Sequence, residues 1–373
     1  MAFELVAEQS ALDRLLEQIA GQSPVAIDTE AASFHRYHDR IYLIQLSTAE
    51  QTWVIDPLGV EDLSGFGSLL ADPEVESIFH DADYDLRLFT KHYDFAARNL
   101  FDTRITAQLL GLPSIGLAAL LQTHFGISPD KRFQRADWSI RPLTTGMLEY
   151  AAGDTSHLVE LRNILRQELV DAGRLSWAEE EFRILEETRW EPAEADPRVT
   201  FLKLKGARAL ERRGLAILRE LYAWREETAS TLDRASFRVM GNEVLLALAA
   251  KPVHDLDALG RVRGVGREIL ARRGEEILAA IERGLAVPDA ELPRFERGPR
   301  RVVDPDFDAR VDRLKLRRNA AAERLGLQPG VLCPNAILEG IARLQPGSVA
   351  EMVAVPGMRD WQREAIGAEL LAE

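Results

Sequence analysis

The 373-residue sequence predicts a mixed α/β domain followed by two all-helical bundles. Over roughly the first 170 residues, short apolar runs typical of strands alternate with segments of helical apolar spacing. After about residue 180 only the helical spacing remains, and the helical part repeats itself at a fixed offset. Because so long a chain exceeds one ordinary hydrophobic core, we expect two or three domains.

Three strand-like runs open the N-terminal region, at Pro24–Glu30, Ile41–Ser47 and Thr52–Asp56. Their short connections predict an antiparallel meander. Further strand-like runs then alternate with helices: strands at Ser77–His80 and Asn99–Asp102, and helices at Leu63–Ala71, near Tyr84–His92, and from Thr103 and Gly116. Three strands followed by this alternation imply a mixed sheet with helices on its faces.

Two proline-containing connectors, at residues 186–205 and 287–305, bound the helical segments. The segment after the second connector repeats the segment before it at a constant offset of 93 residues. The matching pairs are Val239-Met-Gly-Asn242 with Leu332-Cys-Pro-Asn335, Val244-Leu245 with Ile337-Leu338, Leu259 with Met352, and Val262-Arg-Gly264 with Val355-Pro-Gly357. We therefore predict two tandem bundles, and domain boundaries of 1–190, 205–286 and 300–373.

The net charge of −14 is concentrated in the first half of the chain. Residues 1–195 contain 16 Lys and Arg against 33 Asp and Glu, whereas residues 201–285 contain 16 against 12, and residues 286–373 contain 13 against 14. An acidic domain that holds cations, followed by a more basic region that shares phosphate binding, agrees with this distribution. A solvated acidic surface explains it equally well, so charge does not choose between the two.

Composition argues against several classes of protein. No apolar run approaches the roughly 20 residues that span a bilayer, and the N-terminal residues lack the basic and apolar regions of a signal peptide. Cys333 is the single cysteine, which leaves no intramolecular disulfide and no cysteine-built metal site. We expect a soluble cytoplasmic protein, with a monomer favoured.

The first of three acidic elements is Asp28-Thr29-Glu30, at the end of the first predicted strand. The strand period of two places both carboxylates on one face of the sheet. Strand ends also carry acids as solvated caps, so this motif alone indicates little.

The second acidic element is the strand-to-helix junction that contains Asp81, Asp83 and Asp85. Acids near a helix N-terminus complement the positive end of the helix dipole, which accounts for two of the three. Asp85 stands at the edge of an apolar stripe formed by Leu86 and Phe89, where an acid is less expected.

The third element contains Tyr150 and Asp154, which are four residues apart and share one face of a predicted helix. Thr144 is a candidate N-cap for this helix, and its apolar spacing continues to Leu161. A Tyr hydroxyl that simply hydrogen-bonds an Asp explains the pair as well as a catalytic role does.

Together the three elements are far more specific than any one of them. Mg²⁺ and Mn²⁺ prefer oxygen ligands, and typically take a few carboxylates together with waters and substrate phosphates. Two such ions held ~3.5–4 Å apart clamp the attacking and leaving oxygens of an in-line displacement at phosphorus. Four acids and a tyrosine on neighbouring elements would supply that site.

These motifs resemble the DEDD superfamily of 3′→5′ exonucleases, in its tyrosine-bearing branch, and specifically the ribonuclease D family. The resemblance covers essentially the whole chain. It rests on Val25–Glu30, His80–Leu86 and Tyr150–Asp154, reinforced by Leu43–Leu46, Phe101–Thr103 and Asp137–Leu143. The two predicted bundles look like HRDC domains, an accessory nucleic-acid-binding module.

The resemblance implies a ribonuclease-H-like fold and a site with two divalent ions, Mg²⁺ or Mn²⁺. Asp28 would bridge both ions, Glu30 and Asp154 would hold one, and Asp85 would help to hold the other. Tyr150 would orient the attacking water and help it to lose a proton. The products would be nucleoside 5′-monophosphates released from RNA with a free 3′ end, with tRNA precursors as the substrates.

Five more residues are candidates for substrate binding or for support of the site. These are His80, Asp102, Phe34, Trp138 and Arg141. Four of them also have a structural interpretation: His80 as a hydrogen-bonded buried histidine, Asp102 as a strand-end cap, and Trp138 with Arg141 as a structural pair. Two positions differ from the family pattern, since Ala31-Ala32-Ser33 replaces an aromatic residue after Glu30 and Gly153 replaces the commoner alanine.

Two other functions stay open at this stage. A 3′→5′ exodeoxyribonuclease would use the same site. Discrimination between RNA and DNA depends on contacts to the 2′-hydroxyl, and no residue in the sequence identifies such a contact. A non-catalytic RNA-binding protein would keep only the fold, and would be expected to have lost one of the acids. All four acids and the tyrosine are present.

Overall fold

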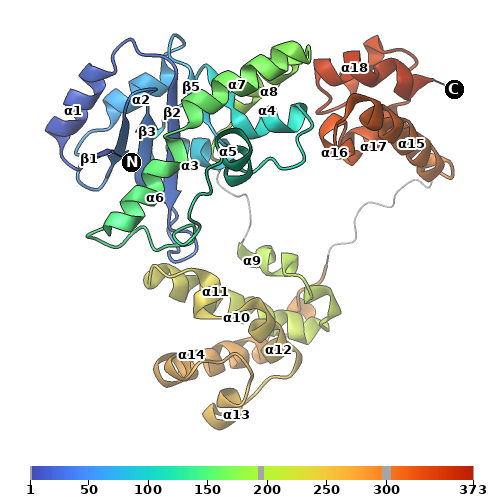
Figure 1. Cartoon of the computed structure of the whole chain (residues 1–373). Coiled ribbons are helices and arrows are strands. Elements are labelled where there is room, and N and C mark those ends of the chain that lie inside the picture. The colour runs from blue at the N-terminus through green and yellow to red at the C-terminus, as the bar shows by residue number, and fades with distance from the viewer. Residues whose placement is uncertain (1, 192–196, 296–303, 373) are drawn as a thin grey trace. The chain divides into compact units, whose positions relative to one another are not determined.

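A computed structural model describes residues 2–191, 197–295 and 304–372 of the chain (Figure 1). The chain forms two compact units. Unit 1 comprises Met1–Ala31, Ile41–Trp190 and Val302–Glu373, and unit 2 comprises Ala32–Arg40 and Glu191–Arg301. The segment Ala32–Arg40 therefore belongs with the first helical bundle, although it directly follows a strand of unit 1.

Unit 1 contains a six-stranded mixed sheet with the strand order β1-β4-β3-β2-β5-β6. Strand β3 is antiparallel to β2 and β4, whereas β1 is parallel to β4, and β5 is parallel to β2 and β6. The strands are β1 Glu4–Val6, β2 Val25–Ala31, β3 Ile41–Ser47, β4 Thr52–Ile55, β5 Ser77–Phe79 and β6 Leu100–Asp102. The predicted mixed sheet and its β2-β3-β4 meander are confirmed.

The helices that accompany the sheet are α1 Gln9–Gln18, α2 Ser64–Ala71, α3 Asp83–Tyr93, α4 Thr103–Leu109, α5 Leu117–Phe125, α6 Thr145–Thr155, α7 Leu158–Asp171 and α8 Leu175–Leu185. Sequence patterns did not predict β1 or α1. Helix α1 is amphipathic, with Leu12 and Leu15 buried. The helical pattern expected from Thr144 to Leu161 is divided, because α6 ends at Thr155 and α7 begins at Leu158.

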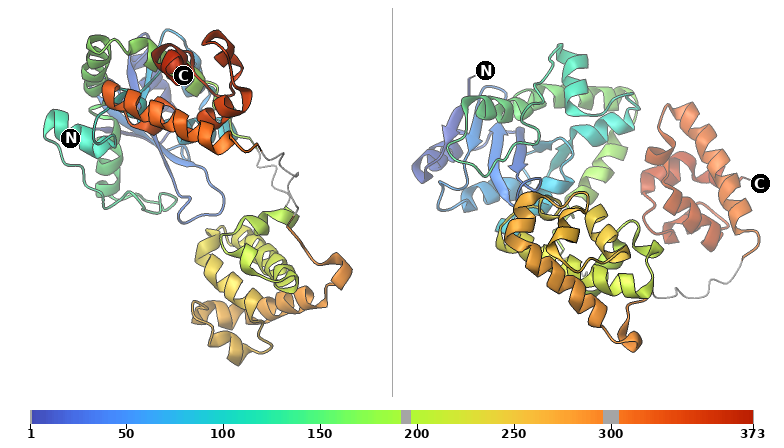
Figure 2. Two further views of the ribbon diagram at one scale, coloured as in Figure 1. Left: turned by 90° about the vertical axis from the view of Figure 1, so that its right-hand side faces the viewer. Right: turned by 90° about the horizontal axis from the view of Figure 1, so that it is seen from below.

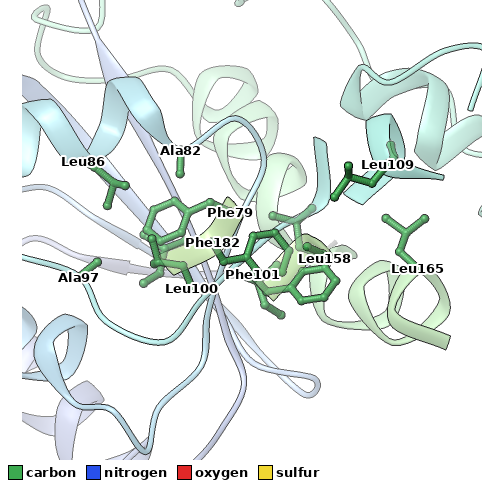
Figure 3. Close-up of a cluster of buried hydrophobic side chains, with 14 of the residues drawn as sticks. Phe79, Ala82, Leu86, Ala97, Leu100, Phe101, Leu109, Leu158, Leu165 and Phe182 are labelled. Atoms are coloured by element: carbon green, nitrogen blue, oxygen red, sulfur yellow. The ribbon is translucent and has the colours of Figure 1, made fainter. Parts of the chain in front are cut away.

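An apolar cluster joins one edge of the sheet to its helices (Figure 3). Phe79 of β5 and Phe101 of β6 meet Phe182 of α8, and the rings of Phe101 and Phe182 lie 5.0 Å apart. Leu86 of α3 and Leu158 of α7 extend the same cluster. Full burial of each such side chain stabilises the fold by about 1.5–3 kcal/mol, so the cluster fixes helix α3 against the sheet.

The C-terminal helices of unit 1 pack against helix α8. They are α15 Phe307–Leu325, α16 Pro329–Leu332, α17 Asn335–Leu344, η4 Ala350–Ala354 and α18 Asp360–Leu371. The Glu180 carboxylate of α8 accepts hydrogen bonds from the backbone N–H groups of Asp360 (2.7 Å) and Trp361 (2.9 Å), and so caps the N-terminus of α18. The Trp361 ring stacks on Trp177 at 4.8 Å.

Unit 2 is a helical bundle with its own apolar core. Its helices are α9 Pro197–Thr200, η1 Phe201–Lys203, η2 Ala207–Ala209, α10 Arg212–Thr231, α11 Ser236–Val239, α12 Asn242–Ala250, α13 Leu256–Gly260, α14 Arg267–Ala286 and η3 Asp289–Glu291. In both views of Figure 2 these helices, yellow-green to orange, pack around one another. Phe34, from the segment Ala32–Arg40, contacts Phe237 of this bundle edge to face at 5.0 Å.

The predicted duplication extends to individual hydrogen bonds. The Arg225 guanidinium donates to the Met240 carbonyl (3.3 Å) and to the Asn242 side chain (2.6 Å). Arg318, which lies 93 positions later, donates to the carbonyl of Cys333 (2.9 Å) and to the side chain of Asn335 (2.8 Å). Both arginines are buried, so each bundle is held together by the same internal Arg–Asn contact.

None of the helices in residues 2–191, 197–295 and 304–372 combines the length and the apolar character that a bilayer crossing needs.

Candidate active site

Strand β2 presents Asp28 and Glu30 on one face of the sheet, since successive side chains alternate between the faces. Asp28 lies directly across from Gln45 of β3, and Ala26 lies across from Ser47. The Ser47 hydroxyl hydrogen-bonds the Thr155 hydroxyl of α6 at 2.7 Å. Helix α6 therefore covers the face that carries the two acids.

Asp85 enters the site from the first turn of α3 and is 6% exposed. Its carboxylate accepts a hydrogen bond from the hydroxyl of Thr29, the residue between Asp28 and Glu30. The strand and the helix are thus joined next to the acids. Helix α3 also carries acids in its first turn and Lys91 and His92 in its last, an arrangement that suits the helix dipole.

Helix α6 supplies Tyr150 and Asp154 from one of its faces. The Thr144 side chain accepts a hydrogen bond from the Met147 N–H, so the predicted N-cap is present. One turn apart on the helix, the Tyr150 hydroxyl donates a hydrogen bond to the Asp154 carboxylate. Because Asp154 raises the pKa of Glu30 and of Asp28, these residues of α6 and β2 share one site.

Burial raises the pKa of all four acids above the ordinary values of carboxyl groups, and the charges of neighbouring acids add to the effect for Asp28, Glu30 and Asp85. For Asp28 the main cause is burial, followed by the charge of Asp154. For Glu30, burial is followed by the charges of Asp28, Asp154 and Asp85. Burial likewise raises the pKa of Asp85, and Asp28 adds to the effect. The pKa of Asp154 rises to about 7, although its hydrogen bond from Tyr150 opposes the increase.

The Tyr150 hydroxyl is a weaker acid than an ordinary tyrosine. Burial raises its pKa well above 10, and the charges of Asp154, Glu30 and Asp28 raise it further. Its ring lies 6.0 Å from that of Trp138 and 6.2 Å from that of Phe133. Tyr150 therefore keeps its proton at neutral pH and has a fixed orientation toward Asp154.

Asp102 organises the junction that carries Asp85, and it is 1% exposed. Its carboxylate caps α4 by accepting from the N–H groups of Arg104 (2.8 Å) and Ile105 (2.9 Å). The other oxygen accepts from the Ala82 N–H (2.8 Å), one residue before α3 begins. Burial raises the pKa of Asp102 to about 6 despite these bonds. Asp102 thus sets the position of the first turn of α3.

His80 is half-buried at the same junction. Its Nδ1 hydrogen-bonds the Thr103 hydroxyl at 2.9 Å, and burial lowers its pKa to about 4. The side chain is therefore neutral at physiological pH and has a partner inside the fold, which suits a supporting role.

Arg141 has all five of its N–H donors engaged within the fold. It donates to both oxygens of Asp56 (2.6 and 2.9 Å) and to the carbonyls of Trp138 (2.7 Å), Ile140 (2.9 Å) and Tyr42 (2.9 Å). Trp138 is 1% exposed. Arg141 therefore fixes the segment that places Trp138 beside Tyr150, and has no donor left for a phosphate.

Phe34 lies in unit 2, whereas the acids lie in unit 1. Besides its contact with Phe237, its carbonyl accepts a hydrogen bond from the Arg238 guanidinium at 2.7 Å. The segment that follows strand β2 is thus held by the first bundle.

Two contributors to the site were not singled out from the sequence, Thr29 and Gln45. Gln45 is fully buried, and neither polar atom of its amide has a hydrogen-bond partner among the described residues. A buried amide without a partner costs about 1–3 kcal/mol. The signal available in the sequence was a single polar residue inside the apolar run Ile41–Leu46.

A hollow of about 400 Å³ opens beside Tyr150 and Asp154. Its walls are formed by the same face of α6, including Gly146, Gly153 and His157, and by residues 127–132. A side chain at Gly153 would meet no atom within 4 Å. The hollow gives solvent and a ligand a path to the Tyr150 hydroxyl.

The residues of the site fit divalent cations by their chemistry. Carboxylate oxygens are the ligands that Mg²⁺ and Mn²⁺ prefer, and in the described part of the chain no Lys or Arg forms an ion pair with any of the four acids. Bound cations would relieve the repulsion that raises their pKa values. Within the described residues, no three His, Cys, Asp or Glu side chains form a ready-made metal site.

Comparison with known proteins matches both halves of the chain. Residues 3–170 match the 3′-5′ exonuclease family, and residues 214–281 and 307–373 match the HRDC domain. Ribonuclease D of Granulibacter bethesdensis is 33% identical over 374 residues, covering 99% of this chain and 91% of the relative. Ribonuclease D of Pseudomonas paraeruginosa is 29% identical, covering 98% and 96%.

Solved structures give the same result. Escherichia coli RNase D, an exoribonuclease involved in structured RNA processing, superposes with a TM-score of 0.72 at 26% identity, covering 99% of this chain and 98% of the other. The catalytic core of RRP6 from Trypanosoma brucei superposes with a TM-score of 0.69 at 27% identity, covering 76% and 80%. The chain belongs to the ribonuclease D family and is a 3′→5′ exoribonuclease.

Proposed function

We propose that the chain hydrolyses RNA from its 3′ end with the help of two divalent cations, Mg²⁺ or Mn²⁺, and releases nucleoside 5′-monophosphates. The observation that carries the proposal is the group of four acids from β2, α3 and α6, in which the charges of neighbouring acids raise the pKa values of Asp28, Glu30 and Asp85. Repulsion between neighbouring carboxylates destabilises a folded chain, whereas a cation site needs several carboxylates close together.

Each acid has a proposed place in this site. Asp28, whose charge raises the pKa of both Glu30 and Asp85, would be shared by both cations. Glu30 and Asp154 would hold one cation, and Asp85 would contribute to the other. When bound, the cations would supply Lewis acidity at the phosphodiester and charge for the departing oxygen. Thr29 would keep Asp85 beside Asp28 through its hydrogen bond.

Tyr150 would hold and orient the attacking water. Its raised pKa keeps the proton on the hydroxyl, so it would act through hydrogen bonding and not as a phenolate. Asp154 accepts the hydrogen bond of that hydroxyl and would keep it directed at the water. Trp138 and Phe133 would keep the Tyr150 ring in place.

For the substrate we propose structured RNAs with 3′ extensions, tRNA precursors among them. The involvement of the E. coli relative in structured RNA processing supports this choice. We further propose an exonuclease domain over residues 1–190, a first HRDC domain over 205–286 and a second over 300–373. The HRDC segments would hold RNA while its 3′ end reaches the acids.

Digestion of a 3′-extended tRNA precursor tests this function. With Mg²⁺ or Mn²⁺, we expect stepwise shortening from the 3′ end and 5′-monophosphates as the products, and no shortening in EDTA. Internal cuts, or equal rates with and without EDTA, would rule out the proposed chemistry. A matched DNA strand in the same assay separates an exoribonuclease from an exodeoxyribonuclease.

A further inference from the structure

Unit 2 has a basic hollow of about 740 Å³ outside the segment matched as an HRDC domain, which is 214–281. Residues 199–208 form one side and Arg294 with Phe295 form the other. Among the described residues, the lining contains four cations and no carboxylate; the cations are Lys203, Lys205, Arg208 and Arg294. Two stretches that flank the bundle in sequence thus build a positively charged groove.

The four cations of this groove are not used to hold the fold. All four are exposed, and none forms an ion pair or a side-chain hydrogen bond with another described residue. Two arginines close by in sequence behave differently. Arg212 donates to the Leu292 carbonyl (2.8 Å), and Arg213 donates to the Leu285 carbonyl (2.9 Å) and pairs with Asp289 (2.5 Å). The groove cations therefore keep their donors for a ligand.

The floor of the groove is apolar and aromatic. Leu202, Leu204 and Phe295 pack against the core of the bundle. The Arg208 guanidinium lies over the Phe295 ring at 4.5 Å. Stacking fixes the plane of the guanidinium and leaves its N–H edges free, the geometry in which arginine binds phosphate with two hydrogen bonds. The groove thus combines preorganised phosphate donors with a flat apolar surface.

Charge and shape together favour one class of ligand. Proteins bind single-stranded nucleic acid with basic side chains placed along its phosphate backbone and with an aromatic surface on which a base stacks. The rest of the chain has a strongly negative charge, so a local group of uncompensated cations attracts a polyanion to this place.

We propose that this groove binds single-stranded RNA, with phosphates on Lys203, Lys205, Arg208 and Arg294 and a base against Phe295. The choice of RNA as the polyanion rests on the proposed function. The groove would hold the body of a substrate apart from the residue being removed. It would add affinity for RNA that does not depend on a free 3′ end.

Binding of a labelled circular RNA by the full chain in EDTA tests the groove, because a circle has no 3′ end to occupy the exonuclease site. Lys203→Glu/Lys205→Glu is compared with Arg14→Glu/Arg166→Glu, which makes the same change of charge at exposed positions of unit 1, outside the groove and outside both HRDC segments. Loss of two phosphate contacts should weaken binding at least tenfold and reduce the slope of log K against log salt by about 1.4. The control should bind within about twofold of wild type.

Wild-type affinity in the groove variant, or an equal loss in both variants, would overturn the proposal. Thermal unfolding verifies that each variant is folded, and Lys203→Gln/Lys205→Gln repeats the comparison with a smaller change of charge. Because the assay contains no cation and no cleavable end, a failure of the groove is distinct from a failure of the hydrolytic site.

Discussion

At the scale of single residues, the site brings carboxylates together that repel one another, whereas other acids of unit 1 are kept apart or paired. Most acids of unit 1 are exposed or paired with arginine, as Asp83 is with Arg87 and Glu76 with Arg162. Asp28, Glu30, Asp85 and Asp154 instead face one another under helix α6. In the absence of cations, ionisation of these acids opposes folding. The free energy of unfolding therefore reports on their ionisation and on cation binding.

The pKa of Asp154 predicts a specific pH dependence. Its folded-state pKa of about 7 lies above its ordinary value of 3.8, so this group's contribution to stability is present below about pH 4 and is lost as the pH rises through about 7. In EDTA, Asp154→Asn should therefore become progressively more stable than wild type between about pH 4 and about pH 7. Urea unfolding at several pH values measures the difference.

The control for this experiment is Asp171→Asn, at the exposed C-terminal end of α7. Its stability relative to wild type should change little over the same range. Mg²⁺ at the upper pH should stabilise wild type and not Asp154→Asn. A difference for Asp154→Asn that does not vary with pH would contradict the raised pKa.

Asp102 offers a test of positioning. In Asp102→Asn one oxygen can still cap α4, but the new NH₂ group faces the Ala82 N–H and breaks the link to α3. We expect a loss of about 1–3 kcal/mol in the free energy of unfolding, and a higher Mg²⁺ concentration for half-maximal activity, because Asp85 lies in the first turn of α3. The control is Asp62→Asn, at an exposed residue whose carboxylate accepts hydrogen bonds from the Ser64 N–H and hydroxyl (2.8 Å each), and this variant should change neither quantity. Unaltered Mg²⁺ dependence in Asp102→Asn would show that Asp102 does not position Asp85.

The sequence could predict only part of the site at this scale. Asp28 with Glu30, and Tyr150 with Asp154, are visible because strand and helix periods act over two to four residues. Thr29 and Gln45 were not, because their partners are set by packing. Thr29 meets a residue 56 positions away, and Gln45 becomes a neighbour of Asp28 only when β3 pairs with β2.

At the scale of elements, apolar periodicity located every strand of the sheet except β1. Only Val6 of the three residues of β1 is buried, so no apolar run marks this strand, whereas the equally short β5 and β6 are buried throughout. The break between α6 and α7 was also missed, because the apolar spacing continues across Ser156 and His157. The duplication was found because 93 residues separate equivalent core positions in both bundles.

The repeated Arg–Asn contact predicts parallel effects in the two bundles. Arg225→Leu leaves the Asn242 side chain and the Met240 carbonyl without their donor, and Arg318→Leu does the same to Asn335 and Cys333. Each variant should lower the free energy of unfolding by about 2–3 kcal/mol, with hydrogen exchange increased in its own bundle. The exposed pair Arg272–Glu268 supplies the control, and Arg272→Leu should cost under about 1 kcal/mol. Equal effects of Arg272→Leu and Arg225→Leu would refute the structural role of the buried arginines.

At the scale of the whole molecule, unit 1 joins the sheet domain to the C-terminal bundle, a contact that no local pattern predicts. Gly111, at the end of α4, has a φ of +73°, and a Cβ there would lie 1.9 Å from the Gly326 carbonyl oxygen after α15. The Arg174 side chain donates to the Leu109 carbonyl (2.7 Å) and to the Leu325 carbonyl on the two sides of this contact.

Gly111→Ala should detach the C-terminal bundle from the sheet domain. Gly126→Ala is a matched control, since Gly126 has a φ of +69° and an added Cβ there would meet no atom within 4 Å. Both variants bear the strain of a left-handed alanine, about 1 kcal/mol, but only Gly111→Ala also clashes across the contact. Hydrogen exchange at the N-terminus of α18 should rise in Gly111→Ala alone. The same exchange in both variants would mean that the contact is not what holds the bundle.

The central claim, that the four acids perform cation-dependent removal of nucleotides from RNA 3′ ends, is tested most directly with Asp28→Asn. The measurement is release of labelled nucleoside 5′-monophosphate from 3′-end-labelled RNA in Mg²⁺, with Asp83→Asn, an exposed acid two residues before Asp85, as the control. The account predicts a loss of at least about a thousandfold in Asp28→Asn, a normal rate in Asp83→Asn, and folded protein in both. A wild-type rate in Asp28→Asn would contradict it.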